Sequence, residues 1–104
     1  MTCVPIHRIF EEVIERFRHK GLERFFHIGS TLGIQPAHAG KIRMILSALN
    51  QATHIRQMNA PGFDLHPLKG NKAGYWAVTV NKNWRIVFAF EEGNAFDVDY
   101  LDYH

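Results

Sequence analysis

The sequence predicts an α+β fold, in which two N-terminal helices pack on one face of a four- to five-stranded, mainly antiparallel sheet. Apolar residues recur at three- and four-residue spacing in the first half of the chain. From residue 75 onward they alternate along the chain, which is typical of half-buried strands. The segments between the alternating runs are as short as hairpin turns, so we expect neighbouring strands to be antiparallel.

The two expected helices cover residues 20–30 and 36–52. The first carries three apolar residues on one stripe: Leu22, Phe25 and Phe26. Gly29 is suited to end this helix, because glycine readily adopts the left-handed conformation of a helix C-terminus. The second helix begins with Pro36, which fits a first helical turn. Its apolar residues follow at helical spacing: Ile42, Ile45, Leu46 and Leu49.

The segment before residue 20 fits two interpretations. One is a helix after Pro5 with an apolar stripe: Ile6, Ile9, Phe10, Val13 and Phe17. The other is an edge strand over VIERFR, at residues 13–18. Periodicity does not distinguish the two, because so short an apolar segment fits both templates.

Three alternating runs predict strands over residues 75–81, 84–91 and 95–100, and a shorter strand is expected at 63–67. The side chains expected to face the helices are Trp76, Val78, Val80, Trp84, Ile86, Phe88, Phe90, Phe96, Val98 and Tyr100. The intervening NKN and EEGN segments are the expected turns. We interpret the aromatic residues of this face as core rather than as a stacking platform.

Composition limits the class of protein. The chain has 104 residues, 46% of them hydrophobic, which suits one domain with one core. Its formal net charge is +2, but residues 1–84 carry +6 and residues 85–104 carry −4. A basic body favours a polyanionic partner, and a solvated surface of mixed charge is an equal alternative. The single cysteine, Cys3, and the lack of a membrane-length apolar run or signal peptide lead us to expect an intracellular protein.

Strand alternation gathers chemically versatile side chains on the face of the sheet that the helices leave open. If Trp84 faces the helices, Arg85 points to the opposite side of the sheet. The same reasoning places His66 and Tyr103 on this open face. Lys69 lies in a glycine-ended turn nearby.

These groups fit the cleavage of RNA by its own 2′-hydroxyl. Imidazole accepts and donates protons near neutral pH, while arginine and lysine neutralise phosphate charge, so no metal is required. The inventory is unspecific by itself, because a histidine on a sheet face is more often a plain surface residue. Asp102 and His104 have the parity of the covered face, which counts against them unless the chain end leaves the strand.

Other chemistries fit less well. The sequence has no CxxC, HxxxH or HExxH spacing for a metal and no glycine-rich nucleotide loop. Cys3 is an improbable nucleophile, and Asp97 with Asp99 is better interpreted as a solvated edge than as a catalytic pair. The remaining histidines are interpreted as surface residues: His7, His19, His27, His38 and His54.

Three segments together resemble a known family: IERFRHKGLERFF (14–26), LHPLKGNKAGYWAVTVNKNWRIVFAF (65–90) and the terminal VDYLDYH. They resemble the HigB toxins of the RelE/ParE superfamily, the toxin halves of type II toxin–antitoxin pairs. The combination of motifs, in this order and spacing, is highly specific. The resemblance implies a RelE-like fold with a single toxin domain over residues 13–104. Residues 1–12 would be an N-terminal extension.

The resemblance implies a ribosome-dependent, metal-independent endoribonuclease that cuts messenger RNA in the ribosomal A site and stops translation, with no cofactor. It implies several partners: a HigA-type helix-turn-helix antitoxin, the ribosome with its 16S rRNA, and the messenger itself. Operator DNA would be bound only through the antitoxin complex, and no membrane is involved. The expected location is the bacterial cytoplasm.

The resemblance also identifies the catalytic residues. His66 of the LHPLKG motif and the terminal His104 would be general base and general acid, in an order that the sequence leaves open. Tyr103 would orient or stack on the nucleotide, and Asp102 would hold an imidazole or an arginine. Arg85 would stabilise the phosphate. Strand parity disagrees for Asp102 and His104, and a bulge or frayed end would resolve the conflict.

Lys69 and Lys72 complete the expected phosphate-binding set together with Arg85. The alternative function is that of a ParE-like inhibitor of DNA gyrase, which performs no RNA chemistry and has no use for the pair His66 and His104. A decayed locus, whose product only binds an antitoxin, is a third possibility. Because one fold hosts both toxin activities, the fold alone does not choose between them.

Overall fold

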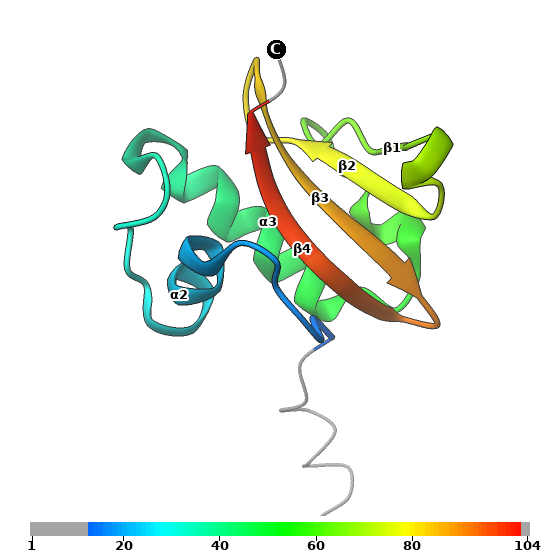
Figure 1. Ribbon diagram of the computed structural model, residues 1–104, viewed down its shortest axis with the longest axis horizontal. Coiled ribbons are helices and arrows are strands. Elements are labelled where there is room, and N and C mark those ends of the chain that lie inside the picture. Colours follow the sequence, from blue (N-terminus) through cyan, green and yellow to red (C-terminus); the bar gives the residue numbers. More distant parts are fainter. Residues whose placement is uncertain (1–12, 103–104) are drawn as a thin grey trace, which may run out of the picture.

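The computed structural model describes residues 13–102 and has an α+β architecture (Figure 1). The helices are α2 (Lys20–Ile28) and α3 (Ala39–Gln51), with short 3₁₀ turns η1 (Pro36–His38), η2 (Ile55–Met58) and η3 (Gly70–Lys72). The strands are β1 (His66–Pro67), β2 (Tyr75–Thr79), β3 (Trp84–Glu91) and β4 (Asn94–Asp102).

The sheet has the strand order β1-β2-β3-β4, and every neighbouring pair is antiparallel. This confirms the expected antiparallel sheet. The segment at residues 13–18 lies beside β4 through two isolated parallel bridges, Ile14 with Ala95 and Phe17 with Val98. The edge-strand interpretation therefore describes this segment better. Most of the alternative helix falls on residues 1–12, outside the described residues.

Local sequence signals explain where the helices begin and end. The Nδ1 atom of His19 accepts a hydrogen bond from the Leu22 amide at 3.0 Å and caps the start of α2. Gly29 ends α2 with φ of 76°, and its N–H donates to the Phe25 carbonyl at 2.9 Å. Pro36 opens η1, which leads directly into α3. The long helix α3 lies behind the sheet in Figure 1, and the nine-residue α2 lies at its side.

One apolar core joins these layers. Leu22 and Phe25 of α2 are buried in the same cluster as Ile42, Ile45, Leu46 and Leu49 of α3. The sheet contributes its covered face to this cluster: Val78, Val80, Ile86, Phe88, Val98 and Tyr100. The opposite side carries Ala77, Val87 and Ala89, and we call it the open face because the helices do not cover it, although the side chains of Ala77 and Val87 are themselves buried. The sheet therefore presents one surface on which a site can be assembled.

Phe96 does not face the helices, contrary to the alternation expected for the last strand. Val87 pairs with Asp99 and Ala89 pairs with Phe96, so β4 carries one more residue than β3 over this stretch. The extra residue forms a bulge around Asp97, whose φ is 51°. Phe96 consequently lies on the open face opposite Ala89, and the buried Ala95 occupies the core position.

Candidate functional site

The register of the sheet brings His66 and Arg85 to the open face. His66 pairs with Ala77, Ala77 with Val87, and Val87 with Asp99, so these residues form one row across the four strands. Arg85 belongs to the neighbouring row, two residues along β3. Ideal strand spacings put the Cα atoms of His66 and Arg85 roughly 12 Å apart. At this separation, both long side chains can reach the same bound substrate. The floor between them is made of small residues.

His66 is half-buried at the start of β1, and its ring orientation is fixed by one contact. Its Nδ1 atom lies 3.0 Å from the backbone carbonyl of Asp64, a residue with φ of 53°. Because a carbonyl only accepts, Nδ1 must carry a proton and donate it. In the neutral ring, Nε2 therefore holds a lone pair that is able to accept a proton.

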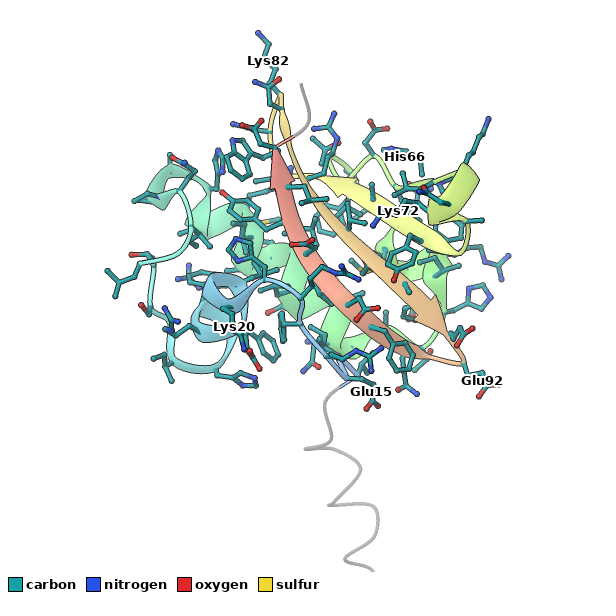
Figure 2. The ribbon with its side chains drawn as sticks, viewed as in Figure 1. Glu15, Lys20, His66, Lys72, Lys82 and Glu92 are labelled. Carbon is teal, nitrogen blue, oxygen red and sulfur yellow. The ribbon has the colours of Figure 1, made fainter. Side chains whose placement is uncertain are left out.

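Lys69 precedes η3 and Lys72 ends it, in the segment that joins β1 to β2, and Figure 2 marks Lys72 beside β2. Both are exposed, and the Lys72 amide donates to the Lys69 carbonyl at 3.2 Å. The Lys72 ammonium lies 5.1 Å from the centroid of the Tyr75 ring, in a cation–π contact. The Lys72 cation is thereby held beside Tyr75, and neither lysine is paired with a carboxylate among the described ion pairs.

Arg85 reaches toward the β2–β3 turn. Its Nη1 atom donates to the backbone carbonyls of Asn81 at 2.8 Å, Trp84 at 3.1 Å and Lys82 at 3.3 Å. These contacts fix the guanidinium beside the turn, at the end of the open face where β4 also ends. The structure thus places Arg85 near the C-terminal end of the chain.

Asp102 ends β4 opposite Trp84 in register and is exposed. It has the parity of the covered face, as the alternation predicts. Tyr103 and His104 lie outside the described residues, so their expected roles, and the convergence of His66 with His104, stay predictions.

A chain of polar contacts on the open face was not expected from the sequence. The Tyr75 hydroxyl donates to Asp97 Oδ2 at 2.9 Å, and Arg16 Nε donates to Asp97 Oδ1 at 2.8 Å. Arg18 approaches the same carboxylate at 4.0 Å. The hydrogen bond from Arg16 lowers the pKa of Asp97, so this carboxylate is charged at neutral pH. Asp97 is therefore held in contacts with Arg16 and Tyr75 and is not a free surface acid.

These residues border a shallow pocket of about 360 Å³ at the end of the sheet farthest from the β2–β3 turn. Its lining includes Arg16, Gly74, Tyr75, Phe96 and Asp97. The guanidinium of Arg16 lies 5.4 Å from the centroid of the Phe96 ring. Sequence reasoning missed this cluster because the bulge reverses the alternation at Phe96, and because the segment that carries Arg16 had two interpretations.

Four histidines interpreted as surface residues have structural partners, although His27, which packs against Phe17 and Phe26, and His54 are exposed as that interpretation expects. His19 caps α2, and His54 Nδ1 accepts from the Arg56 amide at 3.2 Å to cap η2. His38 contradicts the surface interpretation most clearly, because it is only 9% exposed and both ring nitrogens have partners. The interpretation failed because those partners are distant in sequence, as Asn81 and Tyr100 are, and no local pattern predicts them.

Residues 13–102 lack two kinds of feature. No group of three or more His, Cys, Asp or Glu residues in this range is arranged to hold a metal ion. Within the same range, no helix has the length and apolar character needed to cross a membrane.

Comparison with known proteins gives consistent matches. A sequence profile described as the RelE-like toxin of the type II toxin–antitoxin system HigB matches residues 15–104. The curated Endoribonuclease HigB of Proteus vulgaris is 44% identical over 92 residues, which cover 88% of this chain and all of that protein. A solved YoeB/ParE toxin from Agrobacterium tumefaciens has a similar fold, with a TM-score of 0.56 at 18% identity, covering 88% of this chain and 96% of the other.

Proposed function

The chain belongs to the HigB family of RelE-like toxins, and on this premise we propose that it is a metal-independent endoribonuclease that cuts messenger RNA in the ribosomal A site. The toxin domain spans residues 13–104, with residues 1–12 as an extension. The named activity of the relative from Proteus vulgaris supports this proposal, since all of that protein is covered by the match. Cleavage of the messenger arrests translation and growth.

His66 is the general base in this proposal, and its contact with Asp64 carries the assignment. Nδ1 donates to the Asp64 carbonyl at 3.0 Å, which leaves the Nε2 lone pair to take the proton of the 2′-hydroxyl. The 2′-oxygen then bonds to phosphorus, and the bond from phosphorus to the 5′-oxygen breaks. His104 donates a proton to that leaving oxygen, so the products are a 2′,3′-cyclic phosphate and a 5′-hydroxyl.

The cations stabilise the charge that develops on the phosphate. Arg85 presents a fixed guanidinium, because the backbone carbonyls of Asn81 and Lys82 in the β2–β3 turn, and of Trp84 at the start of β3, hold its Nη1 atom. Lys69 and Lys72 contribute point charges from the other side of His66. Tyr103 orients or stacks on the nucleotide, and Asp102 holds an imidazole or an arginine.

The partners follow from the same family. The chain pairs with a HigA-type helix-turn-helix antitoxin, acts on ribosomes through 16S rRNA, and meets operator DNA only within the antitoxin complex in the bacterial cytoplasm. Antitoxin docking over α2, the turn that follows it and α3 is supported by three exposed apolar side chains. Ile28 is 73% exposed, Leu32 87% and Met44 58%, and such groups are commonly covered in a complex.

Induced expression of His66→Ala tests the role of the base. We expect growth arrest to be relieved and the rate of messenger cleavage to fall by about 100-fold or more, because general-base catalysis contributes 10²–10⁴-fold. His54→Ala is the matched control, since this exposed histidine caps η2 and is not part of the sheet. Full toxicity of a folded His66→Ala variant would contradict the assignment.

Primer extension on a reporter message separates this function from the ParE-like alternative. Cuts that appear only in translated messages are expected from a ribosome-dependent endoribonuclease. Intact messenger together with DNA-damage signalling would identify a gyrase inhibitor instead. Wild-type expression without any growth arrest would indicate a product that only binds its antitoxin.

A further inference from the structure

His38, at the end of η1, is a buried polar residue away from the open face whose two ring nitrogens both have partners. Its ring is buried beneath the β2–β3 turn, in T-shaped contact with Trp84 at 5.8 Å between ring centroids. We propose that His38 is a positioning residue for RNA cleavage, which holds Asn81 so that the turn keeps the Arg85 guanidinium in place. This inference rests on the proposed function and adds to it a residue remote from the substrate.

The orientation of the Asn81 amide determines which ring nitrogen of His38 carries the proton. Asn81 Oδ1 accepts hydrogen bonds from the backbone amides of Asn83 and Trp84, both at 3.1 Å. Its Nδ2 atom is consequently the one that lies 2.8 Å from His38 Nε2, and an amide NH₂ only donates. His38 Nε2 must therefore hold a lone pair, and the neutral ring carries its proton on Nδ1.

The other ring nitrogen is held by β4. His38 Nδ1 lies 2.7 Å from the hydroxyl oxygen of Tyr100, which also accepts from the Gln35 amide at 3.3 Å. Burial raises the pKa of Tyr100, so the phenol stays protonated and neutral. Tyr100 stacks on Trp84 with ring centroids 4.4 Å apart. His38 is thus clamped between the strand that ends at Asp102 and the turn that precedes Arg85.

Asn81 transmits this constraint to Arg85. Its side-chain amide is held in place by the hydrogen bond to His38. Its backbone carbonyl accepts a hydrogen bond from Arg85 Nη1 at 2.8 Å, the shortest of the three carbonyl contacts. Rotation of Asn81 would also release the amides of Asn83 and Trp84, which shape the turn. Loss of His38 would therefore displace the acceptors that orient the guanidinium, and a displacement near 1 Å costs up to about 100-fold in rate.

A purely structural role for His38 makes a different prediction. Buried polar networks stabilise folds whether or not they serve a site, and removing one then lowers stability without coupling to catalysis. In that case, substitutions at His38 and Arg85 would have independent effects on the cleavage rate of the folded protein. If His38 acts by positioning Arg85, the combined effect of the two substitutions on the cleavage rate must be smaller than the product of their separate effects.

A double-mutant cycle distinguishes these roles. We expect His38→Leu to lower the single-turnover cleavage rate on translating ribosomes by about 10- to 100-fold, with ribosome affinity unchanged. In the Arg85→Ala background the same substitution should change the rate by less than about twofold, since independent sites add and coupled ones do not. His38→Gln, which offers an amide acceptor to Asn81 and a donor to Tyr100, should restore most of the rate.

Asn81→Ala serves as a second variant, because Asn81 is exposed and its loss leaves the core intact even where His38→Leu fails to fold. It should reproduce the rate loss and the coupling to Arg85→Ala, whereas His54→Leu, at the histidine that caps η2, should match the wild type. If the wild type cleaves and the effects of the His38 and Arg85 substitutions on the rate are fully additive, the positioning role is wrong and the proposed function stands. Absence of wild-type cleavage would overturn the proposed function, and the positioning role with it.

Discussion

Asp97 adopts a left-handed backbone conformation at the bulge in β4, which an aspartate tolerates better than most residues. Its side chain is 23% exposed and joins the Tyr75 hydroxyl to the Arg16 guanidinium. A single residue thereby bends the strand, turns Phe96 outward and neutralises a cation at the pocket. The bulge connects the edge segment at residues 13–18 to the open face.

Acid should weaken this contact in a defined direction. The pKa of Asp97 is lowered in the folded state, chiefly by the hydrogen bond from Arg16, so its stabilising contribution is complete above the ordinary carboxyl range. It is lost as the pH falls through the lowered value. We expect Asp97→Asn to lower the free energy of unfolding by about 0.5–1 kcal/mol at pH 7, and by much less near pH 2.

Urea unfolding of the two proteins at both pH values measures this difference. Glu92→Gln is the control, because Glu92 also has a left-handed φ, of 50°, and is exposed in the β3–β4 turn. An Asp97→Asn effect that persists undiminished in acid would show that the charge of the carboxylate is unimportant.

At the scale of the elements, two glycines allow α2 to approach the loop that precedes η1. A Cβ atom on Gly33 would lie 2.5 Å from the Cα of Gly21, and one on Gly21 would lie 2.6 Å from the Cα of Gly33. Both obstacles are backbone atoms, which cannot rotate away as a flexible side chain does. The packing of α2 against this loop therefore requires glycine at both positions.

Gly33→Ala should lower the free energy of unfolding by about 1–3 kcal/mol, because the added methyl group forces the two backbones apart. Gly40→Ala is the matched control: a Cβ atom on Gly40, in α3, would meet nothing within 4 Å, so alanine should stabilise the helix by about 0.5–1 kcal/mol. Thermal or urea unfolding measures both. Equal stability of Gly33→Ala and the wild type would mean that α2 shifts without cost.

Periodicity predicted the longer strands and the helix α3, but the strand expected at 63–67 is reduced to His66–Pro67, and periodicity left the segment 13–18 undecided. The strand expected at 84–91 is observed over those residues, and Gly29 ends α2 as its αL preference predicts. Alternation also placed His66 and Arg85 on one face. It failed at Phe96, because an extra residue in a strand leaves no trace in hydropathy. It could not find His38, whose partners are 62 and 43 residues away in sequence.

At the scale of the whole molecule, opposite charges are separated along the chain and partly recombined in space. Residues 1–84 carry +6 and residues 85–104 carry −4. Arg16 from the basic part neutralises Asp97 from the acidic part. The cations at Lys69, Lys72 and Lys82 have no such acidic partner among the described ion pairs, and they remain available to a polyanion.

Under the proposed function, we expect Lys82 to contact ribosomal RNA without taking part in the chemistry. Figure 2 shows it at the tip of the β2–β3 turn, directed away from the body of the protein. Only its backbone carbonyl contacts Arg85, at 3.3 Å, and that contact survives truncation of the side chain.

Lys82→Ala should therefore weaken ribosome binding while leaving the cleavage rate at saturating ribosomes unchanged. The plot of log affinity against log salt should become shallower by about one unit, because each phosphate contact contributes nearly one released counterion. Lys41→Ala is the control, since the Lys41 ammonium already donates to the Gly62 carbonyl at 3.0 Å. An unchanged salt slope, or a loss of cleavage rate with affinity intact, would show that the tip of this turn does not contact the RNA.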